Sequence, residues 1–334
     1  MGVNLKDLVV KKKITLADLS GKKLAVDAYN QLYMFLSSIR QRDGTPLKDS
    51  KGNITSHLSG LFYRTSNLLE AGVLPCFVFD GAAPELKAET QEQRRLIKVE
   101  AEKKYKEALE KGEMEAARKW AQQTSKLTPE MVSESKKLLD VLGIPWVQAI
   151  AEGEAQAAYM TARGWTYAVA SQDFDALLFG TPKLVRNISI TGKRKLPGKA
   201  AFVEVQPEEI DLVETLNALS IDKHQLIQLA ILIGTDYNAG IKGVGPYSAL
   251  RIVKEGKFNS YAKKIKYCDR IQKIFLNPPV VVHISLEWRD TDPDKIKQLL
   301  CAQHDFSEQR VDNTLKKLES AKKGKEQESL RKFL

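Results

Sequence analysis

Short apolar segments alternate with longer amphipathic ones along much of the chain. The apolar segments have the length and composition of strands buried on both faces of a sheet, and they lie at residues 23–26, 76–79, 167–170 and 183–185. Between them, residues 56–70 and 129–142 repeat apolar positions at the spacing of an α-helix. This alternation predicts an α/β fold with a mostly parallel central sheet flanked by helices.

Residues 84–128 interrupt the alternation with a long charged segment. From Pro84 to Glu130 the chain has eleven Lys or Arg residues and ten Asp or Glu residues, with few apolar residues between them. The pattern predicts one or two charged helices around Gly112. A solvated helical hairpin without a role is one interpretation, but a long polar insertion beside a compact core is uncommon unless it has a function.

Acidic residues follow the apolar segments with unusual regularity. They are Asp27, Asp80, Glu152, Glu154, Asp173, Asp175 and Asp236. The carboxyl ends of parallel strands meet at the edge of the sheet where α/β proteins bind their ligands. We therefore expect these seven carboxylates to converge.

Seven clustered carboxylates would repel one another unless cations lay between them. Oxygen ligands favour Mg²⁺ or Mn²⁺, and the four histidines of the chain lack the spacing of a zinc site. Two such ions, one activating water and the other stabilising the leaving oxygen, form the working unit of phosphodiester hydrolysis. The alternative is that each acid caps a helix or forms a turn.

A glycine hairpin at residues 240–246 and a net charge of +10 indicate a polyanionic partner. Two close glycines before a helix let backbone N–H groups approach a phosphate, and Lys242 adds a positive charge. Such an element grips a nucleic-acid backbone without regard to base sequence. An ordinary turn between two helices is the other interpretation.

These motifs closely resemble those of the flap endonucleases, the structure-specific 5′ nucleases of archaeal and eukaryotic replication and repair. The resemblance extends over essentially the whole chain through MGVNLKDLV, VDAYNQLYMFLSSIRQ, FVFDGAAPELKAET, IPWVQAIAEGEAQAAYM, SQDFDALLFG and ILIGTDYNAGIKGVGP. It implies a PIN-like nuclease core that cuts a phosphodiester near the junction of a 5′ flap, with 5′–3′ exonuclease activity. A relative that prefers another junction, and a catalytically silent protein that binds DNA junctions or a clamp, are the alternatives.

The resemblance also assigns roles to single residues. It implies that the seven acids bind two Mg²⁺ ions, which Mn²⁺ can replace, and that Lys87 and Arg94 contact the scissile phosphate. It implies that DNA is bound by Tyr33, Arg40, Lys242, Gly243 and Gly245. The hairpin would hold K⁺ through carbonyl groups, although Gly240 stands where some relatives have a hydroxyl ligand.

The resemblance divides the chain into parts. It implies an N-terminal nuclease region at 1–83, a helical arch at 84–128, an internal nuclease region at 129–320 with a helix-two-turn-helix at 225–255, and a flexible tail at 321–334. The tail resembles a sliding-clamp (PCNA) binding motif, and the matching residues are Gln327, Leu330, Phe333 and Leu334. The three cysteines are widely spaced, which favours a reducing, intracellular location. The chain has no apolar run long enough to span a membrane, so we expect no membrane partner. We also expect a monomer.

Overall fold

The central sheet forms from the predicted apolar segments together with three further strands. The computed structural model describes residues 2–189, 192–195 and 202–333. Its main sheet contains β1 (Lys11–Lys13), β2 (Lys23–Asp27), β3 (Leu74–Phe79), β4 (Trp146–Gln148), β5 (Ala168–Ala170), β6 (Lys183–Arg186) and β9 (Glu208–Asp211). The strand order is β1-β9-β6-β5-β2-β3-β4, and the five strands from β6 to β4 are parallel. This confirms the predicted mostly parallel α/β fold.

The strands at the β1 end of the sheet were not predicted. Strand β9 runs antiparallel to both of its neighbours, β6 and β1. Strand β1 consists of three lysines, so no apolar pattern marks it, and it exists through its pairing with β9. A separate two-stranded hairpin pairs β7 (Gly192–Lys195) with β8 (Phe202–Val205).

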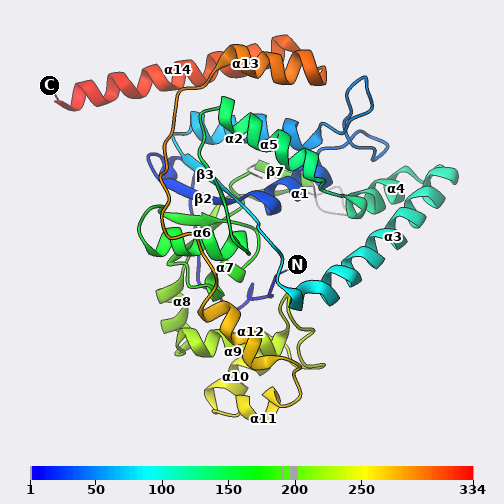
Figure 1. Ribbon diagram of the computed structural model, residues 1–334, viewed down its shortest axis with the longest axis vertical. Coiled ribbons are helices and arrows are strands. Elements are labelled where there is room, and N and C mark those ends of the chain that lie inside the picture. The colour runs from blue at the N-terminus through cyan, green and yellow to red at the C-terminus, as the bar shows by residue number, and fades with distance from the viewer. Residues whose placement is uncertain (1, 190–191, 196–201, 334) are drawn as a thin grey trace.

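Both faces of the sheet are buried, which explains why its strands are continuously apolar. Along β2, Leu24 and Val26 belong to one hydrophobic cluster and Ala25 belongs to the other. The first cluster is covered by α1 (Ala28–Ser38), α2 (Ser56–Glu70), α5 (Pro129–Val141), α13 (Pro293–Lys297) and α14 (Glu308–Phe333). Figure 1 shows α2, α5, α13 and α14 above the strands.

The opposite face carries a second helical layer. It consists of α6 (Gly153–Ala162), α7 (Asp175–Leu178), α8 (Leu212–Leu219), α9 (Lys223–Ile233), α10 (Pro246–Lys254), α11 (Phe258–Ala262) and α12 (Cys268–Leu276). A short 3-10 turn, η1 (Ala17–Leu19), precedes β2. The helix α9, the glycine hairpin and α10 form a helix-turn-helix at the lower end of the molecule in Figure 1.

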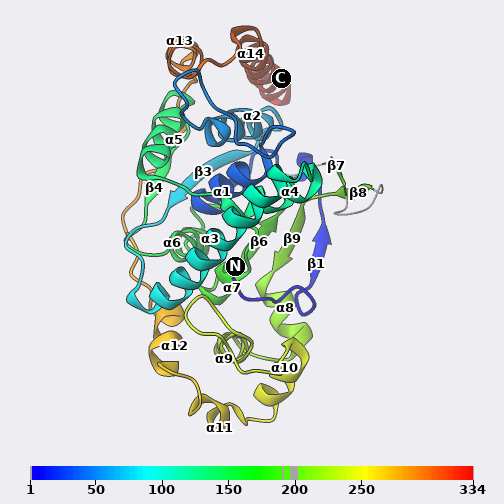
Figure 2. The same cartoon turned by 90° about the vertical axis from the view of Figure 1, so that its right-hand side faces the viewer.

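The charged insertion folds as two helices that project from the body. It consists of η2 (Glu85–Lys87), α3 (Ala88–Glu110), α4 (Met114–Ala121) and η3 (Gln122–Thr124). Gly112 lies between the two helices with φ +71°, as the charge pattern predicted. In Figure 2 the pair crosses in front of α6 and the sheet. We call this projecting segment, residues 84–128, the arch.

Residues 277–292 form an extended strap that joins α12 to α13. The strap is held by backbone and side-chain hydrogen bonds to the body, such as Trp288 Nε1 to the Pro75 carbonyl at 2.9 Å. A one-turn π-helix, η4 (Gln298–Ala302), then leads toward α14.

The segment expected to be a flexible tail continues α14 as far as Phe333. Its residues favour helix, and Lys323 pairs with Glu319 one turn earlier at 2.6 Å. Leu334, one of the predicted clamp-binding residues, lies outside the described residues. Among the helices of the described ranges, none is long and apolar enough to cross a membrane.

Candidate active site

The seven predicted acids reach one region from five different places in the fold. Strand β2 ends at Asp27, Asp80 follows β3, and α6 begins with Glu152 at its N-cap and Glu154 in its first turn. Asp173 and Asp175 follow β5, as predicted. Asp236 differs, because the apolar run before it is the end of α9 rather than a strand. The helix-turn-helix therefore supplies one acid to a site made by the sheet.

Hydrogen bonds from neighbouring side chains hold the acids in place. Val26 pairs with Ala170 across β2 and β5, so the next residues, Asp27 and Ser171, lie side by side. The Ser171 hydroxyl is 3.2 Å from Asp27 Oδ2 and 3.2 Å from Glu154 Oε1. Asn30 donates its side-chain N–H to Asp173 at 3.1 Å. Ser171 and Asn30 were missed by the sequence reasoning, although both stand within the quoted motifs.

Backbone amides complete the framework of the acids. Gly153 N–H donates to Asp80 at 2.6 Å, and Val3 N–H donates to Asp175 at 2.7 Å. Gly2 lies so close that a Cβ at this position would stand 2.5 Å from Asp175 Oδ1. The first residues of the chain thus form one wall of the site.

Burial and mutual repulsion make these acids hold protons more tightly than free carboxyl groups do. Burial is the largest cause for each of Asp27, Asp80 and Asp175, and the charges of neighbouring acids add to it. Their pKa values rise to about 8, about 6 and about 7, respectively. The pKa of Glu154 is raised for the same reasons. Such a cluster is a strong site for cations.

Two cations from the base of the arch already contact the cluster. Lys87 pairs with Glu152 and lies 3.5 Å from Asp236, and Arg94 Nη2 lies 2.5 Å from Asp236 Oδ1. Both side chains therefore reach the same carboxylate, Asp236. Although burial opposes a charge on Lys87, the charge and hydrogen bond of Glu152 and the charge of Asp236 raise its pKa.

The donor chemistry of the site fits a hard divalent ion. All seven predicted ligands are carboxylates, which are the ligands Mg²⁺ and Mn²⁺ prefer. Within the described ranges, no three His, Cys, Asp or Glu side chains are spaced to hold an ion as they stand. Lys87 and Arg94 instead supply the positive charge. If metal ions bound here, they would replace Lys87 and Arg94 as the partners of Glu152 and Asp236.

Tyr33 lies in the middle of α1 and Arg40 lies just beyond its C-terminal end, and their side chains differ in how free they are to contact DNA. Tyr33 is 38% exposed, and Lys98 of the arch stands 5.0 Å from its ring centroid. The Arg40 guanidinium donates to the carbonyls of Leu36 and Gly44 and to the hydroxyl of Ser125, each at 2.9 Å. Arg40 thus joins the end of α1 to the end of the arch, and its predicted contact with DNA stays a prediction.

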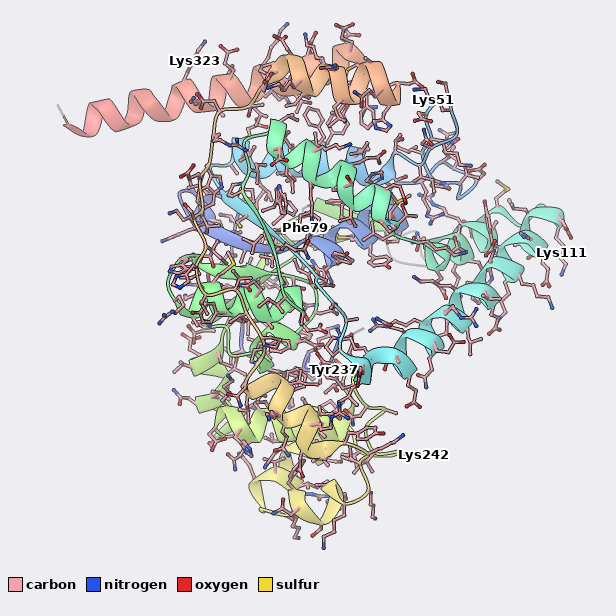
Figure 3. The ribbon with its side chains drawn as sticks, viewed as in Figure 1. Lys51, Phe79, Lys111, Tyr237, Lys242 and Lys323 are labelled. Atoms are coloured by element: carbon pink, nitrogen blue, oxygen red, sulfur yellow. The ribbon has the colours of Figure 1, made fainter. Side chains whose placement is uncertain are left out.

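The glycines of the hairpin differ in the space around them. Gly240 has no room for a side chain, because φ is +72° and a Cβ would stand 2.2 Å from the Ile233 carbonyl oxygen. Nothing lies within 4 Å of a Cβ at Gly243 or Gly245, so a large partner could approach the backbone there. Gly245 is the N-cap of α10. Figure 3 shows Lys242 projecting from this hairpin, below the start of the arch.

Comparison with known proteins gives consistent results. The XPG N-terminal domain model matches residues 1–101, and the XPG I-region model matches residues 143–236. The flap endonuclease 1 of Pyrococcus furiosus is 55% identical over 335 residues, which cover 99% of this chain and 98% of that protein. The flap endonuclease 1 of Thermococcus onnurineus is 53% identical, with coverage of 99% and 98%.

Two solved structures resemble the fold over nearly its full length. Flap endonuclease-1 from Methanococcus jannaschii has a TM-score of 0.78 and 44% identity, covering 97% of this chain and 100% of that one. The catalytic core of Rad2 in complex with DNA substrate has a TM-score of 0.70 and 25% identity, covering 95% and 100%.

Proposed function

This chain belongs to the flap endonuclease family, and we propose that its seven clustered carboxylates hold the two Mg²⁺ ions with which it cuts 5′ flaps. Members of this family are divalent-metal-dependent nucleases, and this chain is a 5′ flap nuclease. The observation that carries the proposal is the buried carboxylate cluster, with raised pKa values, against which two cations of the arch lie. The site fits the hydrolysis of a phosphodiester.

Five of the acids fall into two groups by their surroundings. Glu152 and Asp236 pair with the arch cations, whereas Asp27, Glu154 and Asp173 are tied together by Ser171 and Asn30. We infer that each group contributes to one ion. When bound, the two ions would activate the attacking water and stabilise the leaving oxygen. The chain's own part is to hold these ligands in place, and a set made only of carboxylates favours hard divalent ions over zinc.

Lys87 and Arg94 act on the scissile phosphate in this proposal. In the structure both cations neutralise the acids, and a bound metal would release them from Glu152 and Asp236. Their charges would then face the phosphate that the same metals bind. A preformed pair of donors aimed at a developing negative charge stabilises the transition state without reorganisation of the protein.

DNA would be gripped by three surfaces around this site. Tyr33, exposed beside the arch, would stack on a base near the cut, and the arch would receive the 5′ single strand. The open backbone at Gly243 and Gly245, with Lys242, would bind the phosphates of the duplex arm, and a K⁺ ion would bind at the hairpin carbonyls.

The tail from Gln327 would bind the sliding clamp. The chain would act as a monomer.

Cleavage of a labelled substrate series tests the proposal. We expect Mg²⁺-dependent incision of a 5′ flap near its junction, with slower cutting of nicked duplex and bubble substrates. Ca²⁺, which is larger and coordinates more loosely, should support binding but not cleavage. Equal cutting of all three substrates would contradict flap specificity, and cleavage in excess chelator would contradict the metal site.

A further inference from the structure

Tyr237 follows Asp236 directly, and the base of the arch rests on it. Its side chain is 7% exposed, and the Lys87 ammonium lies 5.5 Å from the centroid of its ring. Phe275 of α12 packs edge-on against the same ring, with centroids 5.4 Å apart and an angle of 74°. The ring thus lies between the arch lysine and the core of the body. Figure 3 shows Tyr237 at the point where the arch begins.

A tight turn fixes the backbone of Tyr237. Thr235 and Asn238 exchange backbone hydrogen bonds at 2.9 and 3.3 Å, and Tyr237 N–H donates to the Thr235 hydroxyl at 3.1 Å. The Asn238 side chain anchors the turn to the Ile231 carbonyl of α9 at 2.8 Å. With the backbone held and Phe275 against it, the ring has little freedom to move. It is a rigid surface for a flexible lysine.

The ring differs from the other partners of Lys87 in one respect. Glu152 and Asp236 also hold the ammonium, but both are carboxylates of the proposed metal site. An aromatic face attracts an ammonium through its quadrupole. Mg²⁺ prefers oxygen ligands, so it does not compete with Lys87 for the ring. When metals take the carboxylates, the ring is the partner that remains.

The contact with Lys87 involves the ring rather than the hydroxyl. Burial and the nearby Glu152 carboxylate raise the pKa of the buried Tyr237 hydroxyl. The Lys87 ammonium lies instead over the ring, so a phenylalanine would keep the surface that Lys87 contacts. The feature that the arch uses is therefore the aromatic face.

We propose that Tyr237 is a positioning residue that holds the Lys87 ammonium at the scissile phosphate through its ring. The inference rests on the proposed role of Lys87 in cleavage. A lysine has four rotatable side-chain bonds, and fixing its charge in the reactive geometry lowers the barrier in the way that other positioning contacts do. Tyr237 also links the arch to the helix-turn-helix, so the surface that grips duplex DNA sets the position of the arch cation.

A double-mutant cycle tests the inference. Single-turnover cleavage of a 5′ flap in saturating Mg²⁺ is measured for the wild type, Tyr237→Leu, Tyr237→Phe, Lys87→Ala and the Lys87→Ala/Tyr237→Leu double variant. We expect Tyr237→Leu to slow cleavage about tenfold, the scale of a desolvated cation–π contact, while the Kd for the junction changes less than about twofold. Tyr237→Phe, the matched control, should retain the wild-type rate.

The cycle separates this inference from the function on which it rests. In the Lys87→Ala background, Tyr237→Leu should cause no further loss, because the ring then has no ammonium to hold. An equal slowing by Tyr237→Leu in both backgrounds would reveal a general structural defect and overturn the inference. A loss in Tyr237→Phe as large as in Tyr237→Leu would also overturn it. Wild-type activity of Lys87→Ala would instead contradict the proposed role of the lysine.

Discussion

Asp27 performs a structural and a chemical task at one position. Its side chain accepts the Asn30 N–H at 2.9 Å and caps α1, while burial and the charges of Asp80 and Asp173 raise its pKa to about 8. Between pH 4 and pH 8 the folded chain therefore holds a proton at this group that the unfolded chain releases. This contribution to stability is present below the unfolded pKa and is lost as pH rises toward 8.

The substitution Asp27→Asn isolates that proton. Asparagine keeps an oxygen that can cap α1 but has no charge to bury. In chelator, we expect the melting temperature of Asp27→Asn to exceed that of the wild type by a few degrees at pH 8, with the difference shrinking toward pH 5. Thermal melts across this pH range measure it. A difference that is constant with pH would show that Asp27 is ionised throughout.

Arg94 provides a second prediction at the scale of one residue. Its guanidinium reaches Asp236, whereas the next residue, Arg95, pairs with Glu92 on another face of α3. Arg94→Ala should lower the single-turnover rate by about 10²-fold, by analogy with the loss of one preorganised donor, and should change affinity less. Arg95→Ala is the control and should cut normally. If binding weakened in proportion to the rate, Arg94 would be a contact for positioning DNA.

At the scale of elements, the sequence predicts the strands and helices whose burial leaves a regular apolar pattern. Strands β2, β3, β5 and β6 and the helices α2 and α5 lie where the apolar pattern placed them, because continuous apolar runs and helical spacing record burial directly. Strand β1 and the strap at 277–292 are polar or irregular, and they depend on pairing with distant segments. Local composition carries no record of such a partner.

The candidate site divides in the same way. The sequence placed the acids near one another, since strand ends share an edge. It could not show that Lys87 and Arg94 contact Glu152 and Asp236, because that contact depends on how the arch returns to the body. Tyr237 was missed for a similar reason, since a buried aromatic residue after Asp236 is indistinguishable in sequence from an ordinary core residue.

The hairpin between α9 and α10 has a testable role as a whole element. Lys242 projects from it beside the open positions Gly243 and Gly245. Lys242→Ala should weaken binding to duplex arms of any sequence and reduce the slope of log K against log salt by about one. Lys323→Ala, on α14, is the control for charge alone. A loss restricted to certain base sequences would indicate recognition of a groove instead.

At the scale of the whole molecule, α14 extends beyond the body as far as Phe333, and Gln327, Leu330 and Phe333 of the predicted clamp-binding motif belong to it. On a helix, Leu330 and Phe333 are three residues apart and would share one face, with Gln327 one turn earlier. Removal of residues 327–334 should abolish stimulation by the sliding clamp and leave clamp-free cleavage unchanged. Steady-state cleavage with and without clamp checks this. Full stimulation of the truncated chain would contradict the assignment.

The central claim is that the carboxylate cluster performs the cleavage while other surfaces bind the DNA. Asp173 lies in the cluster, where it accepts a hydrogen bond from the Asn30 side chain at 3.1 Å. The direct measurement is the single-turnover incision rate of Asp173→Ala in Mg²⁺, with its junction affinity measured in parallel in Ca²⁺. The account predicts no detectable incision and an affinity equal to or tighter than that of the wild type, because clustered negative charge is removed. Incision at the wild-type rate would contradict it.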